Sequence, residues 1–346
     1  MSPAARLALA VVWGMSVLAG PVTARAAQVP AQPVGAAPWG GPPPTGPLAA
    51  SDAFSDTLEI DGAYGTGSVW QVSSHGGTTN GLPSGSVDET VPGLAVHDAS
   101  AGLRTDAFDY GLELWVNNQI YAPTEVTSTT NKLDFGSETM SGLNVAAQYF
   151  VAFNSQTLRE LVTLENNSAS PISRPVYWAS NLGSDGDTVI EDESHFDGMF
   201  TTADRWIVND DGATNHDPAV THVFFGPGVP AVTASSVATS VFLAQGSTNG
   251  VGATFNVTIP AHATRYLMFF SQLNEDPSLA GDNARDMFDA NPPNGGDLLT
   301  GVTHAMQLHI LNWAFTNSVP LAQDDNLLAF TNGGPRPLFV LENDSD

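Results

Sequence analysis

The part of the chain with the clearest capacity for chemistry is an acidic stretch at residues 181–212, NLGSDGDTVIEDESHFDGMFTTADRWIVNDDG. Arg205 is its only arginine or lysine. Its glycines favour turns, and carboxylates on turns supply the hard oxygen ligands that Ca²⁺ binds. The stretch therefore predicts a metal-ordered surface loop, with a solvated acidic loop between two strands as the simpler alternative.

Spacing selects the candidate metal ligands within this stretch. Two aspartates flank Gly186, so one turn can aim both carboxylates at the same point, and three further acidic residues follow closely enough to close the shell. Backbone carbonyls and water would complete the coordination sphere of a Ca²⁺ ion. The predicted ligands are Asp185, Asp187, Glu191, Asp192 and Glu193.

Arg205 and Trp206 are the candidate ligand-binding pair. A guanidinium group can stack on a ring or hold a carboxylate, and an indole offers a large apolar face. Structural roles are the alternative for both residues. Arg205 would then be the counter-charge of Asp204 or Asp187, and Trp206 would be buried in the core, as is usual for a tryptophan in a strand.

No catalytic residues are predicted. The motifs GxSxG, HExxH and GxxxxGK[ST] do not occur in the chain. Glycosidase chemistry needs only two carboxylates at the right separation, and 36 acidic residues make any chosen pair uninformative. For His216 and His222, a zinc site and solvated loop histidines are alternatives. No cofactor other than Ca²⁺ is expected, and an enzyme is the less favoured interpretation.

Composition restricts the classes of partner. The 346 residues carry a formal net charge of −26, and 42% of them are hydrophobic, which is enough for a sizeable core. Nucleic acid is excluded as a partner because its phosphates require basic residues, and an anionic membrane surface is disfavoured for the same reason. The chain contains no cysteine, so disulfides and thiolate metal sites are excluded.

The N-terminal residues are typical of a secretory signal peptide. Arg6 precedes an apolar segment at residues 7–20, and Ala24-Arg25-Ala26 fits a small-x-small cleavage site. The segment is too short to span a membrane comfortably, so we predict a signal peptide at residues 1–26 and no membrane insertion of the mature chain. Residues 27–50 are rich in proline and glycine and predict a disordered linker.

Residues 51–317 have the pattern of an all-β domain. Short runs with alternating apolar and polar residues are separated by turn residues, which predicts a large antiparallel β-sandwich. Two helices are expected late in the domain, at residues 277–290 and 298–313, where apolar residues recur at helical spacing. The expected strands are 57–61, 68–72, 110–116, 132–135, 145–153, 158–165, 174–179, 220–225, 239–243, 253–259 and 265–270.

The tail at residues 318–346 resembles the start of a cadherin-like or VCBS-type (Ig-like) repeat of bacterial surface proteins. The resemblance is carried by AQDD at 322–325 and by LFVLENDSD at 338–346. It implies an extracellular β-sandwich repeat, truncated here and stiffened in its family by Ca²⁺. The positions that match the family's acidic motifs are Asp324, Asp325, Asn343, Asp344 and Asp346.

The domain itself resembles, over a shorter stretch, the galactose-mutarotase-like β-supersandwich modules found with glycoside hydrolases. The run RELVTLENNS at 159–168, followed by Pro171, carries this resemblance. It implies a supersandwich fold and transfers no catalytic residue.

These features predict a protein that is secreted, extracellular or on the cell surface. The leading hypothesis is a non-catalytic module of a bacterial surface protein, which acts in adhesion or in matrix or glycan binding, with an extracellular glycan or surface protein as partner. The alternative is a carbohydrate-active enzyme or its carbohydrate-binding domain, which a cleft holding two carboxylates and a tryptophan would favour. A purely structural spacer is the third interpretation.

Overall fold

The structure, a computed structural model, describes residues 27–28, 55–59, 67–75, 92–153, 155–184, 188–212, 217–244, 246–294 and 296–315. The predicted signal peptide, the cadherin-like tail, and the predicted ligands Asp185 and Asp187 lie outside these residues. Of the predicted linker, only Ala27–Gln28 is described, as the short strand β1.

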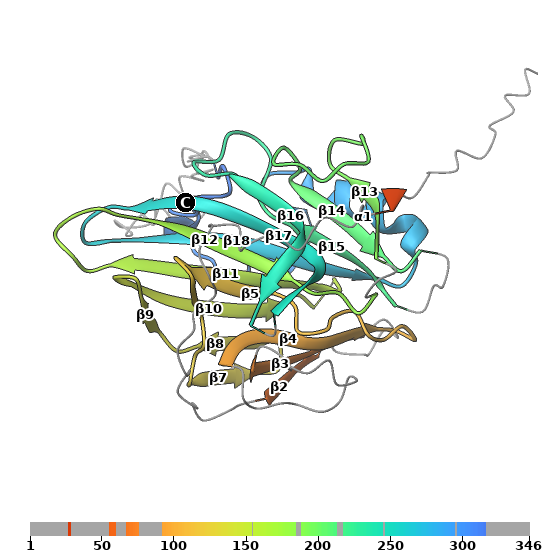
Figure 1. Ribbon diagram of the computed structural model, residues 1–346, viewed down its shortest axis with the longest axis horizontal. Helices are drawn as coiled ribbons and strands as arrows, with labels where there is room; N and C mark the ends of the chain where they lie inside the picture. Colours follow the sequence, from red (N-terminus) through yellow and green to blue (C-terminus); the bar gives the residue numbers. More distant parts are fainter. Residues whose placement is uncertain are drawn as a thin grey trace, which may run out of the picture.

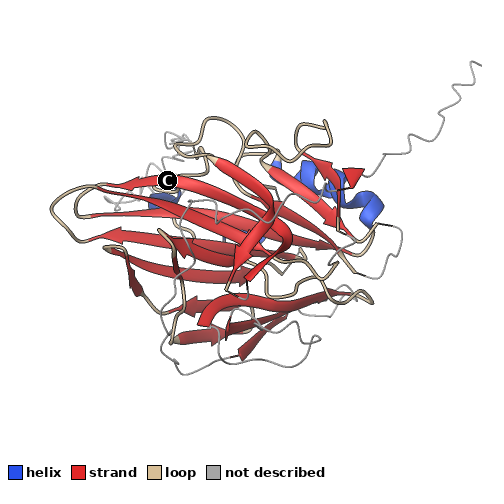
Figure 2. Ribbon diagram, in the orientation of Figure 1, coloured by secondary structure: helices blue, strands red, loops and turns tan. Residues whose placement is uncertain are grey.

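The predicted all-β class is confirmed, because strands dominate the described residues and the helices come late (Figure 2). The strands after β1 are β2 (Ser55–Glu59), β3 (Ser68–His75), β4 (Pro92–Ala101), β5 (Glu113–Val116), β6 (Gln119–Ile120), β7 (Val126–Thr129), β8 (Lys132–Phe135), β9 (Glu138–Met140), β10 (Leu143–Val151), β11 (Thr157–Asn166), β12 (Ile172–Ser180), β13 (Val189–Glu193), β14 (Trp206–Asp210), β15 (Ala219–Val223), β16 (Ser236–Leu243), β17 (Gly246–Ile259) and β18 (Ala263–Asn274).

The strands form three antiparallel sheets. The largest has the order β1-β13-β14-β15-β18-β11-β10-β8-β7, with β9 also paired to β10. A second sheet has the order β16-β17-β12-β5-β6, and the third is β2-β3-β4. Figure 1 shows β2, β3 and β4 along the lower side of the molecule and α1 (Pro277–Phe288) at the upper right, beside β13 and β14.

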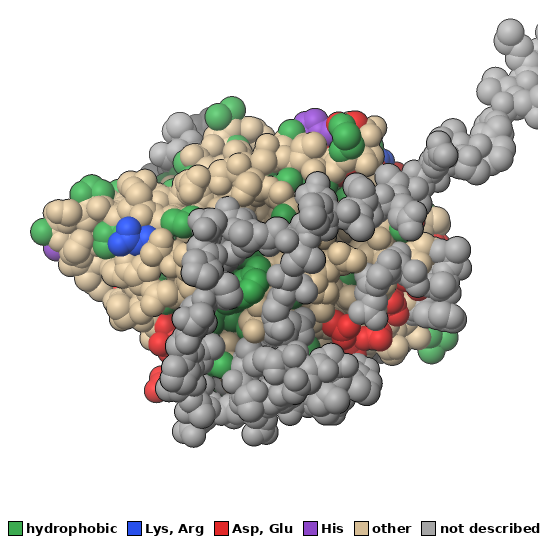
Figure 3. All heavy atoms as spheres, in the orientation of Figure 1, with side chains coloured by type: hydrophobic (Ala, Val, Ile, Leu, Met, Phe, Trp, Pro, Cys, Tyr) green, Lys and Arg blue, Asp and Glu red, His purple; other side chains and the backbone are tan. Residues whose placement is uncertain are grey.

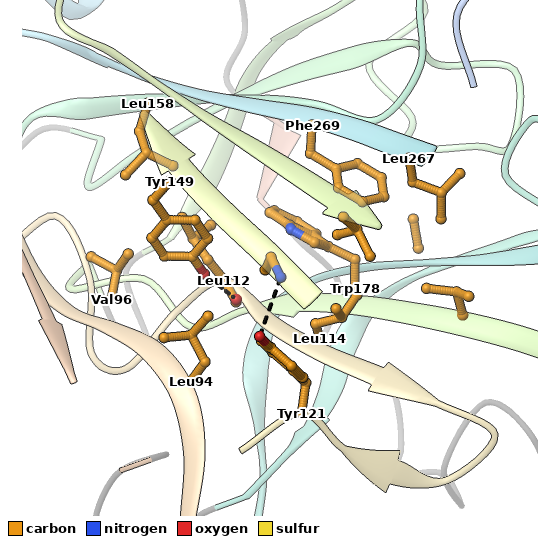
Figure 4. Packing of buried hydrophobic residues seen from close by; sticks show 14 of the residues in the cluster. Leu94, Val96, Leu112, Leu114, Tyr121, Tyr149, Leu158, Trp178, Leu267 and Phe269 are labelled. Carbon is orange, nitrogen blue, oxygen red and sulfur yellow. Dashed lines mark hydrogen bonds between the residues drawn. The ribbon is translucent and has the colours of Figure 1, made fainter. Parts of the chain in front are cut away.

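The main core lies between the two larger sheets and is closed by the third. Alternation along each strand turns one set of side chains inward. From the large sheet these include Tyr149, Leu158 and Phe269, and Figure 4 shows Phe269 beside Trp178 of β12. Two buried tyrosines also donate hydrogen bonds in this core. Tyr149 donates to the Leu112 carbonyl, and Tyr121 donates to the Gly136 carbonyl.

A second apolar cluster covers the opposite face of the large sheet. Helix α1 begins with Asp276 as its N-cap, whose carboxylate accepts the Ser278 backbone N–H at 3.0 Å, and with Pro277 in the first turn. Its buried residues are Ala280, Ala284 and Phe288, one turn apart on the face that meets the sheet. Leu279, although apolar, is exposed.

The predicted helix at 298–313 is wrong in its extent, and its expected apolar stripe is buried at Val302, Ile310 and Trp313 but only partly buried at Leu299 and Met306. The segment holds a 3₁₀ turn (Gly296–Leu299) and the short helix α2 (His304–Gln307). Gly301 separates them with a positive φ of 79°, which ends helical geometry.

No helix in the described part of the chain is long and apolar enough to cross a membrane.

This strap, residues 296–315, is tied to the sheet by polar contacts. Arg159 of β11 donates to the carbonyls of Leu298 and Thr300, at 2.7 and 3.0 Å. The buried Asn312 donates to the carbonyls of Phe224 and Met268 and accepts the Met268 N–H. Trp313 packs so closely on Gly226 that a Cβ there would lie 2.2 Å from the indole.

The acidic stretch is not one surface loop. It contains β13 and β14, which pair with each other and place Trp206, Ile207 and Val208 in the core. The apolar runs are short and bordered by acidic residues, so their periodicity is hidden within the stretch.

The carboxyl group of Glu160 is an ionisable group buried in the main core. Glu160 of β11 is 1% exposed, and its Oε2 accepts the Trp178 indole N–H at 2.8 Å, while Oε1 has no hydrogen-bond partner among the described residues. Burial raises the pKa of Glu160 to about 8, although the bond to Trp178 opposes the shift. The carboxyl group is therefore protonated in the folded chain at neutral pH.

This burial makes stability depend on pH. An unfolded glutamate has a pKa of about 4.3, so between that pH and about 8 the folded state binds more protons at Glu160 than the unfolded state. The contribution of Glu160 to the free energy of unfolding is then largest at acid pH and falls as pH rises through this window. We expect Glu160→Gln, which keeps the acceptor for Trp178, to reduce this fall by roughly 2–5 kcal/mol.

Urea unfolding between pH 5 and 8.5 measures this difference. Glu125→Gln, at an exposed glutamate, is the control and should behave as wild type. A Glu160→Gln chain with the same pH slope as wild type would contradict the assignment.

Candidate functional site

Two buried carboxylates fix the shape of the loop at residues 193–206. Glu193 accepts the backbone N–H groups of His195, Asp197 and Gly198. Asp204 accepts the backbone N–H of Thr201 at 2.7 Å and its hydroxyl at 3.0 Å. Hydrogen bonds to ionised acceptors are the stronger kind, so the turns of this loop are held by its own acidic side chains.

His195 completes a group that can hold a metal ion. One ligand atom each from Glu193, His195 and Asp204 lies within 4.8 Å of the others. The His195 Nδ1 is 3.0 Å from Asp204 Oδ1. Loop donors engage Glu193 Oε1 and Asp204 Oδ2 most fully, so lone pairs remain on the other oxygen of each carboxylate.

Of the predicted metal ligands, this group contains Glu193 alone. Asp192 is 3.5 Å from Arg285 of α1, and Glu191 is half-buried near Asp192, where burial raises the pKa of both carboxyls. His195 and Asp204 were not predicted as ligands. They meet only because β13 and β14 form a hairpin, which the sequence pattern did not predict.

The predicted ligand-binding pair is engaged inside the protein. Trp206 is fully buried and donates its indole N–H to Asp289 at 2.8 Å. Arg205 pairs with the same carboxylate at 3.0 Å, and not with Asp204. The aromatic ring that the loop does expose is Phe196, 58% accessible, with φ of 58° and the Arg285 guanidinium 4.6 Å from its ring centre.

A first hollow, of about 330 Å³, lies beside β4 and is lined by acidic residues. Burial, followed by the nearby Asp106, raises the pKa of Asp98 to about 6. Burial lowers the pKa of His97, which Asp106 opposes. Asp106 itself has a positive φ of 70°. The lining residues are Gln71, His97, Asp98, Thr105, Asp106, Phe108 and Asp109.

A second hollow, of about 350 Å³, lies between α1 and the large sheet where β11 begins and β18 ends. Amide side chains dominate its lining, and no arginine or lysine contributes to it. The residues are Ser155, Gln156, Gln272, Leu273, Asn274, Asn283, Asp286, Met287 and Asn294. We call it the amide hollow.

The amide hollow is built by hydrogen bonds between its walls. Asn283 of α1 donates to Asn274 Oδ1 at 3.0 Å, and Asn274 donates in turn to the Thr221 hydroxyl. Gln156 donates to Glu275, and Asn294 donates to the Asp286 carbonyl. These bonds hold the end of β18 and the side of α1 in fixed positions.

Gln272 is the exception in this network. It is 6% exposed, and its Nε2 reaches only the Met287 sulfur at 3.6 Å. Its Oε1 is buried and has no hydrogen-bond partner among the described residues. An unsatisfied buried acceptor is costly, so its presence in a hollow marks a place where a ligand can supply the missing donor.

Acidic side chains do not cover the molecule evenly. On the face shown in Figure 3, aspartate and glutamate gather in a few places, and most of the described surface is neither charged nor hydrophobic. Such a surface permits contact with an uncharged polar partner despite the net charge of −26.

No family model and no curated protein matches the chain. Solved structures of similar fold include a heparan sulfate lyase from Pedobacter heparinus (8% identity, TM-score 0.40, 66% of this chain and 36% of that chain) and a polysaccharide lyase (9%, 0.35, 53% and 31%). A galactose mutarotase-like protein from Lactobacillus casei is also similar (9%, 0.38, 64% and 100%). This chain spans about a third of the length of the two lyases.

Proposed function

We propose that this chain is an exported, non-catalytic module that binds glycans through the amide hollow. The observation that carries the proposal is the buried Gln272 Oε1, an acceptor without a partner in a hollow lined by amides. A sugar hydroxyl both donates and accepts hydrogen bonds, and an amide side chain offers the complementary pair. The signal-like N-terminus and the cadherin-like tail support export and attachment to a cell surface.

Size supports the same assignment. A hollow of about 350 Å³ falls within the range of small-molecule sites, and can take one or two sugar units at the end of a longer chain. The partly buried Met287 supplies apolar surface for the C–H face of a sugar ring. Adhesion to a glycan-bearing matrix is the biological role that fits such a site on a surface protein.

Removing the unpartnered acceptor tests the site. We expect Gln272→Leu to weaken binding of any glycan found by array screening at least tenfold, which corresponds to about 1.4 kcal/mol. Calorimetry on the chain without residues 1–26 measures the change. The variant should melt at or above the wild-type temperature, because it removes an unsatisfied polar atom.

The matched control is Gln119→Leu, an exposed glutamine on β6 of the other large sheet. It should bind as wild type does. If no glycan binds, or if glycans bind equally well to Gln272→Leu, the amide hollow is not the binding site.

We further propose that Glu193, His195 and Asp204 hold a divalent cation. Ca²⁺ was expected from the acidic stretch, but the imidazole of His195 favours Zn²⁺ or Mn²⁺, since Ca²⁺ prefers oxygen ligands. The role would be structural, because the two carboxylates already shape the loop.

Thermal unfolding distinguishes the ions. We expect micromolar Zn²⁺ or Mn²⁺ to raise the melting temperature, because an ion that binds only the folded state stabilises it. NaCl at equal ionic strength should not, and Ca²⁺ should act only at much higher concentration. His195→Ala should abolish the response, whereas His309→Ala, at an exposed histidine of the strap, should retain it. Equal responses to all salts would mean that Glu193, His195 and Asp204 shape the loop without binding a metal ion.

A further inference from the structure

The charge on the lining decides which glycans fit the amide hollow. Asp286 contributes a carboxylate, and no hydrogen bond or ion pair engages that carboxylate within the described residues. A second carboxylate, Glu275, stands beside the hollow, 3.1 Å from the Gln156 amide nitrogen. The nearest arginine on α1, Arg285, is directed away to Asp282 and Asp192. A sulfated or uronic-acid glycan would therefore meet negative charge without a compensating base.

The hydrogen-bonding groups show the same bias. The amide nitrogens of Gln156, Asn274, Asn283 and Asn294 each already donate a hydrogen bond within the protein. Within the described residues, the buried Gln272 Oε1 and the exposed Asp286 carboxylate accept no hydrogen bond. A ligand that donates hydrogen bonds can therefore engage both acceptors.

An ammonium group meets both requirements. It carries three N–H donors, no acceptor and a positive charge. Placed in the hollow, it would satisfy the buried Gln272 oxygen and neutralise Asp286, and the negative charge of the whole chain would favour its approach. A neutral sugar hydroxyl can satisfy Gln272 but leaves Asp286 without a counter-charge.

We propose that the amide hollow selects glycans that carry free amino groups, that is, amino-sugar units without the N-acetyl group. This rests on the proposed glycan-binding function and names its ligand class. Gln272 accepts one N–H of the ammonium, Asp286 provides the counter-charge, and Met287 contacts the face of the sugar ring. Acetylation of the amine removes the charge and adds a bulky group, so it should abolish the preference.

Three soluble oligosaccharides of equal length test this selection by calorimetry at low salt: one of glucosamine, one of N-acetylglucosamine and one of glucose. We expect the glucosamine oligomer to bind at least tenfold more tightly than the other two. Its affinity should fall with rising NaCl, because the contact with Asp286 is electrostatic.

Variants separate this inference from the function beneath it. Asp286→Asn should remove the preference for the amine and retain binding of the sugar, and Gln272→Leu should weaken all oligomers. Asp282→Asn is the control on the same helix, because Asp282 is already paired with Arg285 at 2.6 Å. If the neutral oligomers bind as well as glucosamine, the amine preference is wrong and glycan binding stands. If none of the three binds, and a glycan array finds no other ligand, both proposals fail.

Discussion

The hydrogen bond between Trp178 and Glu160 is the constraint around which the two large sheets are arranged. Trp178 lies on the inner face of one sheet and Glu160 on the inner face of the other, and both are buried. Their bond fixes the two sheets relative to each other at one point, while the surrounding contacts are apolar and less directional. A protonated carboxyl group can occupy this position at neutral pH because burial raises its pKa. The core thus contains a directional hydrogen bond without the cost of a buried charge.

Helix α1 connects the two candidate sites. On the side of the acidic stretch, Arg285 pairs with Asp192 and lies over Phe196, and Asp289 at the helix end binds Trp206 and Arg205. On its other side, Asn283, Asp286 and Met287 form a wall of the amide hollow. The position of α1 on the sheet therefore sets the geometry of both sites. A cation that orders the loop at 193–206 would also restrain the helix that lines the hollow.

The sequence was informative where alternation was undisturbed. The strand expected at 132–135 is β8, and those expected at 158–165 and 174–179 lie within β11 and β12, because inward apolar residues alternate with outward ones there. The long helix expected at 298–313 is interrupted at Gly301. The helical spacing of apolar residues continues past this position, but the helical conformation of the backbone does not. Strands β13 and β14 were hidden by acidic neighbours. Glu160 and Arg159, neighbours on β11, are both completely buried, which was not expected, since paired or protonated interior charges leave no periodic signal.

The candidate sites were less predictable than the fold. The amide hollow is assembled from β11, β18, α1 and the segment after α1, which meet only in the folded molecule. Glutamine and asparagine are also common surface residues, so these residue types did not indicate a binding site. The metal-capable group combines the end of β13 with a residue just before β14, and its recognition requires the pairing of those strands.

The strap at 296–315 has a consequence for the order in which the molecule matures. It covers Phe270, Met268 and other outward apolar residues contributed by strands that precede it in the chain. A nascent chain leaves the ribosome N-terminus first, so the sheet can pair its strands before this cover arrives. Until then the outer apolar face of the large sheet is exposed to chaperones and to other copies of the chain. Asn312 and Trp313, which fasten the cover to Met268, would determine when that period of vulnerability ends.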